Sequence, residues 1–153
     1  MKFLIFCMGN ICRSPVVAEV VRSRFAKAGL DIAIESAGTE NYHVGEPADA
    51  RAIASARAAG YDIGSHRARQ LTAADFVAFD RLYAMDRVNL RAALRCCAPE
   101  HAAKAMLFLP AAGIADVSEV PDPYYGGHAD FQRVIELAER GAGALIERLK
   151  KGA

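Results

Sequence analysis

Two residues near the start of the chain, Cys7 and Arg13, have the types and the spacing needed to attack and hold a phosphate group. A cysteine thiolate is a strong nucleophile, and the planar guanidinium of arginine donates two parallel hydrogen bonds to phosphate oxygens. This spacing is common by chance. The residues between the two and the elements on either side must therefore decide whether it marks a phosphate-binding site.

The loop from Cys7 to Arg13 has the composition of an anion-binding nest. Gly9 and Asn10 tolerate left-handed backbone conformations, and a loop that curls with its N–H groups inward binds anions. A helix that begins near Ser14 adds the positive end of its dipole. The same field stabilises a thiolate at Cys7, and the Ser14 hydroxyl can donate a hydrogen bond to the sulfur. The segment reads Cys7-Met8-Gly9-Asn10-Ile11-Cys12-Arg13-Ser14-Pro15.

Asp122 is a candidate general acid from a distant part of the chain. It lies between Pro121 and Pro123, which stiffen the backbone around it. A general acid must be protonated when the ester bond breaks, and a neighbouring phosphate dianion favours the protonated carboxyl. Without further context, an ordinary surface turn is the simpler explanation of this aspartate.

Short apolar runs alternate with amphipathic stretches along the chain. We expect strands at residues 2–6, 32–36, 81–85 and 104–109, helices from Ser14 to about Gly29 and at 48–59, 72–78, 87–95 and 129–150, and a long loop at 110–128. This alternation predicts an α/β fold: one three-layer domain of residues 1–153, with a four-stranded parallel sheet covered by helices on both faces. Ligands bind such sheets beyond the carboxyl ends of the strands, where the phosphate-binding loop follows the first strand.

The composition sets outer limits on function. The chain has 153 residues, 53% of them hydrophobic, and a formal net charge of +1, which does not indicate a nucleic-acid or membrane-surface binder. The first apolar run is too short for a secretory signal, and no stretch is long enough to cross a membrane. Four cysteines without a C-x-x-C pair argue against a disulfide scaffold or a zinc ribbon. We therefore expect a cytoplasmic protein with reduced thiols, as a monomer or weak dimer.

Residues 7–15 closely resemble the active-site loop of low-molecular-weight protein tyrosine phosphatases, and the resemblance covers nearly the whole chain. The loop and the Asp122 segment, in this order and at this separation, form a specific signature. Further matches are Ser36-Ala37-Gly38-Thr39, Val44-Gly45-Glu46-Pro47, His66-Arg67-Ala68-Arg69-Gln70, Ala84-Met85-Asp86 and Val120-Pro121-Asp122-Pro123-Tyr124-Tyr125-Gly126-Gly127.

The resemblance implies a role for each site residue. Cys7 would become phosphocysteine, Arg13 would bind the phosphoryl group and stabilise its transition state, and Asp122 would protonate the leaving phenolate and then activate water. No metal or cofactor is implied. The phosphate-binding residues would also include Met8, Gly9, Asn10, Ile11, Cys12 and Ser14. Asn10 would hold the strained loop through a network with Ser14, Ser36 and His66.

Substrate preference is expected to come from three residues around the loop. By resemblance, Tyr42 and Tyr124 would wall the entrance and stack on an aryl phosphate, although many bacterial relatives carry Trp at the first position. Related protein-arginine phosphatases tend to have Thr where this chain has Ile11, so the larger side chain favours a phosphotyrosine-like ester. Ordinary packing is the alternative explanation of both tyrosines.

The remaining chemical groups leave alternatives open. Cys12 could form a reversible disulfide with Cys7, as the resemblance supports, or be a small buried side chain. Cys96 and Cys97 are expected to be structural or incidental, and a structural hydrogen bond is preferred over base catalysis for His66. Glu19 and Asp86 could each buttress the site, or be solvated or capping residues.

Two other functions compete with the expected hydrolysis of protein phosphotyrosine. Arsenate reductases share this fold and loop type, but need resolving cysteines that reach Cys7, whereas Cys96 and Cys97 are adjacent. A binding module with a dead site would lack the nucleophile or the acid, and both are present. The expected partner is a phosphotyrosine protein, by analogy a bacterial tyrosine kinase or its substrates.

Overall fold

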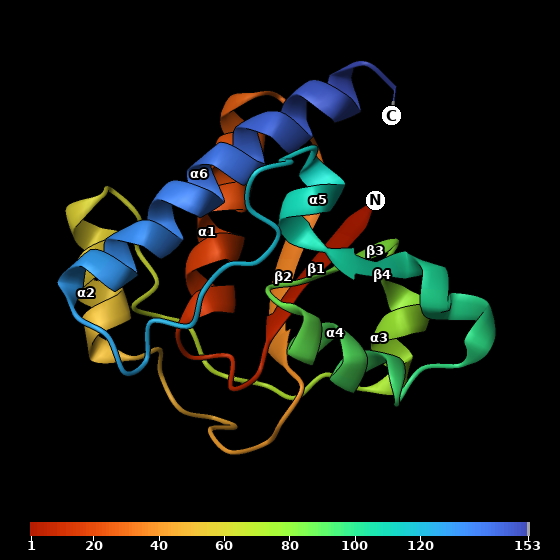
Figure 1. The fold of residues 1–153 in the computed structure, drawn as a ribbon, viewed down its shortest axis with the longest axis horizontal. Helices are drawn as coiled ribbons and strands as arrows, with labels where there is room; N and C mark the ends of the chain where they lie inside the picture. The colour runs from red at the N-terminus through yellow and green to blue at the C-terminus, as the bar shows by residue number, and fades with distance from the viewer. Residues whose placement is uncertain (153) are drawn as a thin grey trace.

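The computed structural model describes residues 1–152, which contain one four-stranded sheet. All of its strand pairs are parallel, and the strand order is β2-β1-β3-β4. The expected α/β fold with a parallel sheet is therefore confirmed (Figure 1). The strands are β1 (Lys2–Cys7), β2 (Ala33–Gly38), β3 (Arg81–Ala84) and β4 (Ala105–Leu107).

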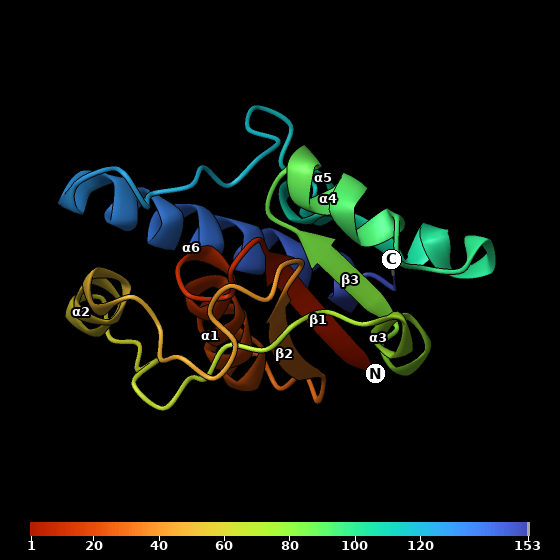
Figure 2. The same ribbon diagram turned by 90° about the horizontal axis from the view of Figure 1, so that it is seen from below.

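Helices cover both faces of this sheet, as the two perpendicular views show (Figures 1 and 2). One face carries α1 and the long α6, with α2 and α5 packed beside them; the other carries α3 and α4. The helices are α1 (Arg13–Lys27), α2 (Ala50–Ala58), α3 (Ala73–Ala78), α4 (Arg87–Leu94), α5 (Phe108–Ala112) and α6 (His128–Lys150), with a 3-10 helix, η1 (Pro99–Lys104).

The central strand β1 explains why the core has two halves. Phe3 and Ile5 point into the larger cluster under α1 and α6, whereas Leu4 and Phe6 point into the smaller cluster under α3 and α4. All four side chains are fully buried. A strand buried on both faces needs a continuous apolar run instead of an alternating one, and the chain has such a run here.

The predicted strand at residues 104–109 is shorter than expected. Only Ala105–Leu107 form β4, and the helix α5 begins at Phe108 inside the stretch expected to be strand and loop. Pro110 was expected to end a strand; it lies instead in the first turn of α5, where its missing N–H is not needed. The helix η1, which precedes β4, was also not predicted.

The carboxyl end of β1 leads directly into the loop of residues 7–13, here named the phosphate loop. Strand β2 runs beside it, with Cys7 paired to Gly38. The amides of Thr39 and Glu40 donate to the carbonyl oxygens of Cys7 and Met8 at 2.9 and 3.0 Å. A Cβ at Gly38 would lie 2.6 Å from the Met8 carbonyl oxygen, so only glycine allows this close approach.

Candidate active site

Asn10 is the internal brace of the phosphate loop. Its side chain is fully buried and its φ is +59°, a left-handed conformation that asparagine tolerates better than most residues. The side-chain amide donates to Ser14 Oγ at 2.8 Å and to Ser36 Oγ at 3.0 Å. Its Oδ1 accepts a hydrogen bond from the Arg69 amide at 3.0 Å. The network expected around Asn10 is therefore present in the structure.

His66 holds the same residue from outside the loop. Its Nε2 lies 2.7 Å from the carbonyl oxygen of Asn10, and because that oxygen can only accept, Nε2 carries the proton. Burial lowers the pKa of His66 below its ordinary value, in opposition to this backbone hydrogen bond, which raises it. The geometry matches the expected structural hydrogen bond.

The sulfur of Cys7 lies at the base of the loop, where two donors meet it. Ser14 Oγ is 3.0 Å from Sγ, and the backbone amide of Asn10 donates to Sγ at 3.3 Å. Because the Asn10 side chain already donates to Ser14 Oγ, the serine hydroxyl donates its own proton, and Cys7 Sγ at 3.0 Å is nearer to it than the Ala37 carbonyl oxygen at 3.4 Å. Cys7 is only 3% exposed, so the sulfur can be approached only through the cavity above it.

Arg13, the first residue of α1, is anchored by one of its terminal nitrogens. Nη1 donates to Asp86 Oδ2 at 2.6 Å and to the Val120 carbonyl oxygen at 3.1 Å. Nη2 lies 3.6 Å from Asp122 Oδ2, so this side of the guanidinium faces the acid. Burial alone would lower the pKa of Arg13, but Cys7, Asp86 and Asp122 raise it above its ordinary value.

Asp86 thus both buttresses the site and caps a helix, two roles that the sequence left open. One carboxylate oxygen grips Arg13, and the other accepts from the Asn89 amide and caps the start of α4. Glu19 does not buttress the site: it pairs with Arg22 on the exposed side of α1. The difference follows from chain direction, because Asp86 follows the carboxyl end of β3, next to the loop, whereas Glu19 lies inside a helix that runs away from it.

Asp122 reaches the site from the segment of residues 114–127, here named the acid segment. Its side chain is 48% exposed. One oxygen, Oδ1, accepts from the Tyr124 amide at 3.1 Å, and the other faces Arg13. The candidate acid and the candidate nucleophile, 115 residues apart in the sequence, therefore line the same cavity.

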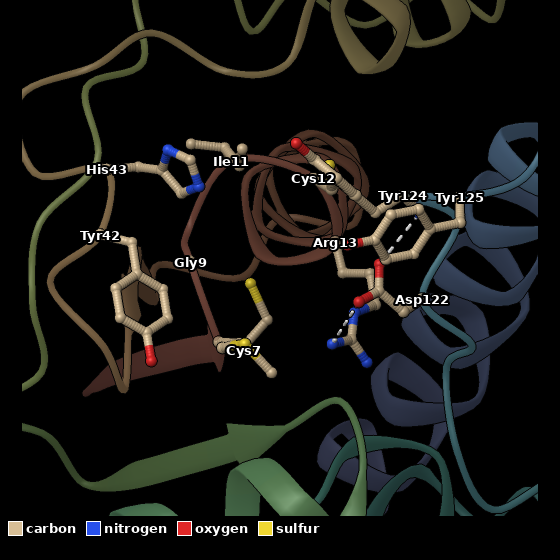
Figure 3. Close-up of a pocket in the computed structure, with 11 residues that line it drawn as sticks. Cys7, Gly9, Ile11, Cys12, Arg13, Tyr42, His43, Asp122, Tyr124 and Tyr125 are labelled. Carbon is tan, nitrogen blue, oxygen red and sulfur yellow. Dashed lines mark hydrogen bonds and ion pairs between the residues drawn. The ribbon is translucent and has the colours of Figure 1, made fainter.

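This cavity has a volume of about 380 Å³ and opens to solvent above Cys7. Figure 3 shows Cys7 between two aromatic walls, with Tyr42 on one side and Tyr124 on the other. Tyr42 is 67% exposed and Tyr124 is 39% exposed, so both present their rings to an incoming ligand. The lining residues are Cys7, Met8, Gly9, Ile11, Cys12, Arg13, Tyr42, His43, Asp122, Tyr124 and Tyr125.

The structure brings all the predicted site residues together. Nine of the thirteen line the cavity, and the other four, Asn10, Ser14, Ser36 and His66, form the network behind the phosphate loop. Sequence reasoning missed His43 and Tyr125 as lining residues, and the Val120 carbonyl oxygen as an anchor for Arg13. Adjacency to Tyr42 and Tyr124 was the available signal for the first two; nothing in the sequence indicates the third.

Cys12 lies in the wall of the cavity as a buried free thiol. Burial, followed by the nearby Asp49 carboxylate, raises the pKa of Cys12 to about 12, so this thiol is neutral near pH 7. Cys7 is also a free thiol, and the Cys7–Cys12 disulfide stays a prediction.

Within residues 1–152, no group of three or more His, Cys, Asp or Glu side chains is placed to hold a metal ion. In the same residues, no helix combines the length and apolar character needed to cross a membrane.

Comparison with known proteins places this chain in a family. Residues 2–153 match the family described as low molecular weight phosphotyrosine protein phosphatase. Among curated relatives, a low molecular weight protein-tyrosine-phosphatase of Streptomyces coelicolor is 40% identical over 151 residues, which cover 95% of this chain and 91% of that protein.

Solved structures of similar proteins share both the fold and the length of the chain. A protein tyrosine phosphatase from Entamoeba histolytica, crystallised with Hepes in the active site, has a TM-score of 0.94 and 36% identity, and the match covers 99% of this chain and 98% of that one. Wzb from Vibrio vulnificus in complex with benzylphosphonate has a TM-score of 0.84 and 31% identity, covering 96% and 97%.

Proposed function

The chain belongs to the low molecular weight phosphotyrosine protein phosphatase family and is a protein-tyrosine phosphatase, and we propose that residues 1–153 form one catalytic domain that works through Cys7, Arg13 and Asp122. One observation carries this assignment. A buried sulfur with two hydrogen-bond donors lies at the base of a cavity that also contains a half-anchored arginine and a carboxyl group.

Binding uses the part of Arg13 that the protein leaves available. Asp86 and Val120 occupy Nη1, so Nη2 is directed toward the cavity, where it lies 3.6 Å from Asp122. A phosphate dianion that enters competes with Asp122 for this nitrogen. The amides of the phosphate loop and the positive end of α1 complete the anion site.

The first chemical step transfers the phosphoryl group to sulfur. The Cys7 thiolate attacks phosphorus, the S–P bond forms, and the P–O bond to the phenol breaks on the opposite side. Asp122 gives its proton to the departing phenolate oxygen, which leaves as a phenol. Arg13 stabilises the charge on the equatorial oxygens of the transferring group.

The second step returns the enzyme to its starting state. Asp122, now a carboxylate, takes a proton from water as the water oxygen attacks phosphorus. The S–P bond breaks, inorganic phosphate is released, and the Ser14 hydroxyl 3.0 Å away stabilises the departing thiolate. No metal or redox group is needed to balance either step.

Aryl phosphates, and phosphotyrosine in proteins above all, fit the shape of this cavity. Tyr42 and Tyr124 offer aromatic faces on opposite sides of Cys7 (Figure 3), and rings stack favourably on such faces. A similar structure binds benzylphosphonate, which joins a phosphonate to a benzyl group. Ile11 lines the wall and adds apolar contact. A phosphotyrosine protein is the partner that this shape supports, and a bacterial tyrosine kinase or its substrate is proposed by analogy with bacterial relatives.

Arsenate reduction receives no support from the positions of the other cysteines. Helix α4 is capped by Asp86 at its start, and Cys96 and Cys97 follow its last residue, Leu94. Neither cysteine lines the cavity above Cys7, and Cys97 packs against the smaller core cluster. A resolving thiol would have to come within disulfide reach of Cys7.

The test is turnover of phosphotyrosine and p-nitrophenyl phosphate by reduced protein with a chelator present. We expect hydrolysis by the wild type, none by Cys7→Ser, and a loss of about 10²- to 10⁴-fold in Asp122→Ala. Cys97→Ser, at the far end of α4, is the matched control and should keep full activity. Turnover by Cys7→Ser, or dependence of the wild type on added metal, would contradict the mechanism.

A further inference from the structure

Arg51, in the first turn of α2, lies between the phosphate loop and the acid segment without belonging to either. Its side chain is 47% exposed and has no place in the steps described above. Three independent contacts fix its guanidinium: one carboxylate and two aromatic rings.

The carboxylate is Asp49, which ties Arg51 to the phosphate loop. Asp49 caps α2 and holds the guanidinium with both oxygens, at 3.1 Å from Nε and 3.0 Å from Nη2. The Asp49 amide donates to the Ile11 carbonyl oxygen at 2.9 Å. Burial would raise the pKa of Asp49, but these hydrogen bonds from Arg51 lower it, so the pair stays charged. Arg51 is thus fixed relative to the loop that binds phosphate.

The two rings tie Arg51 to the acid segment and to the start of α6. The guanidinium carbon lies 5.4 Å from the ring centre of Tyr124 and 4.9 Å from that of Phe131, in the first turn of α6. Both distances suit a cation–π interaction. Tyr124 in turn donates its amide to Asp122 Oδ1 at 3.1 Å.

The acid segment has few other supports near Asp122. Among the described residues, the hydrogen bonds of residues 121–126 stay within the segment: Tyr124 to Asp122, and Gly126 to the Pro123 carbonyl oxygen at 2.9 Å. The ion pair from Asp122 to Arg13 is long, at 3.6 Å, and bound phosphate competes for the same nitrogen. Stacking of Tyr124 on Arg51 does not use that nitrogen, so phosphate does not compete for this contact.

We propose that Arg51 is a positioning residue that holds Tyr124, and through it Asp122, at the height above Cys7 where the acid meets the leaving oxygen. The proposal rests on the proposed role of Asp122 as the general acid. Arg51 does not line the cavity, and its guanidinium contacts Asp49 and the two aromatic rings, not Cys7. Its loss should weaken proton delivery and leave phosphate binding intact.

The signature of such a role is a change in leaving-group dependence. Phenyl phosphate has a basic leaving group that needs a proton, whereas p-nitrophenyl phosphate has an acidic one that needs it less. For Arg51→Gln we expect kcat/KM to fall about tenfold on phenyl phosphate and about threefold or less on p-nitrophenyl phosphate. Inhibition by inorganic phosphate should change less than about twofold.

A ratio of two substrates measured on one preparation does not depend on the fraction of protein that is folded. The experiment therefore separates positioning from simple loss of stability. Arg51→Lys keeps the charge but cannot grip both Asp49 oxygens or stack a flat face, and it should give an intermediate ratio. Arg57→Gln removes the same charge from the exposed side of α2 and should leave the ratio unchanged.

Combination with Asp122→Ala decides between the two proposals. If Asp122→Ala does not change the substrate ratio, Asp122 is not the acid and the proposed mechanism falls. If Asp122→Ala changes it and Arg51→Gln does not, only the role of Arg51 falls. In Asp122→Ala the further change Arg51→Gln should have no effect on the ratio; a full additional effect would overturn the proposal.

Discussion

The phosphate loop and the acid segment meet at one cavity but are built in opposite ways. Asn10, at the centre of the phosphate loop, is fully buried, and its side-chain amide cross-links the loop by donating to Ser14 and Ser36. The acid segment leaves Tyr125 97% exposed, and the hydrogen bonds of its residues 121–126 stay within the segment. Its buried anchors are few: Ile114, Val120 and Pro123.

The difference indicates a division of labour between binding and proton transfer. A rigid loop can present a complete anion site before substrate arrives, so little energy is spent on ordering it. An exposed segment can admit substrates of different shape and still bring a carboxyl group to the leaving oxygen. Changes in the first region should harm all substrates alike, and changes in the second should depend on the leaving group.

The largest expected effect is that of Arg13→Lys. Lysine keeps the positive charge but loses the fork that Asp86 orients, and we expect kcat/KM to fall about 10³-fold. The loss should be equal for phenyl and p-nitrophenyl phosphate. Arg22→Lys, on the exposed side of α1, is the matched control for steady-state kinetics. A loss confined to phenyl phosphate would contradict this division between binding and proton transfer, because Arg13 would then act through the general acid.

Asn10→Ala tests the bracing of the phosphate loop. The substitution removes hydrogen bonds to Ser14, Ser36 and the Arg69 amide and places alanine at a positive φ. We expect the free energy of unfolding, measured in urea, to fall by about 3 kcal/mol. We also expect kcat/KM to fall about 10²-fold for every aryl phosphate. Asn41→Ala, in an exposed loop, should change neither. Full stability of Asn10→Ala would show that the loop is held elsewhere.

The pKa of Cys12 measures how well the cavity wall is shielded from water. Its pKa of about 12 in the folded protein lies above the ordinary 9.0, so the folded state prefers the neutral thiol. The stabilisation is complete below pH 9 and is lost as pH rises toward 12. Between pH 9 and 11 the free energy of unfolding should fall by about 2 kcal/mol more in the wild type than in Cys12→Ala. If urea titrations showed the same dependence of unfolding free energy on pH in both proteins, Cys12 would be accessible to water in the folded state.

The smallest expected effect is at the mouth of the cavity. Tyr42 is 67% exposed, so Tyr42→Ala should raise KM for phosphotyrosine about threefold and leave kcat and inhibition by inorganic phosphate unchanged. Val77→Ala is a control of similar exposure on α3. A large drop in kcat would show that Tyr42 takes part in catalysis. The mouth of the cavity would then not differ in role from its base at Cys7.

The parts of the site that sequence reasoning found are local or carried by the family resemblance. Cys7, Asn10 and Arg13 lie in one continuous segment after an apolar strand, so spacing and composition indicate them directly. Asp122 was recognised through its segment, since an aspartate between two prolines is otherwise an ordinary turn. The fold class followed from alternation, because buried strands and amphipathic helices have different periods.

The parts that were missed or left open depend on distant contacts. Asp86 was left open as a buttress or a capping residue, because nothing near it in the chain indicates that its carboxylate meets Arg13, 73 positions away. The start of α5 at Phe108 was read as strand, because a short apolar run fits either element until its neighbours are known. Arg51 stacks on rings 73 and 80 residues further along, a relation that only the packing of α2 against α6 creates.

The contact at Gly38 has a consequence for how the active protein forms. The carbonyl of Met8 fits against this residue only when Cys7 pairs with Gly38, since a one-residue slip would bring the methyl of Ala37 or the side chain of Thr39 against the loop. A chain whose first two strands are misaligned cannot shape the loop. During refolding, recovery of phosphate binding therefore marks the moment at which these strands reach their native register.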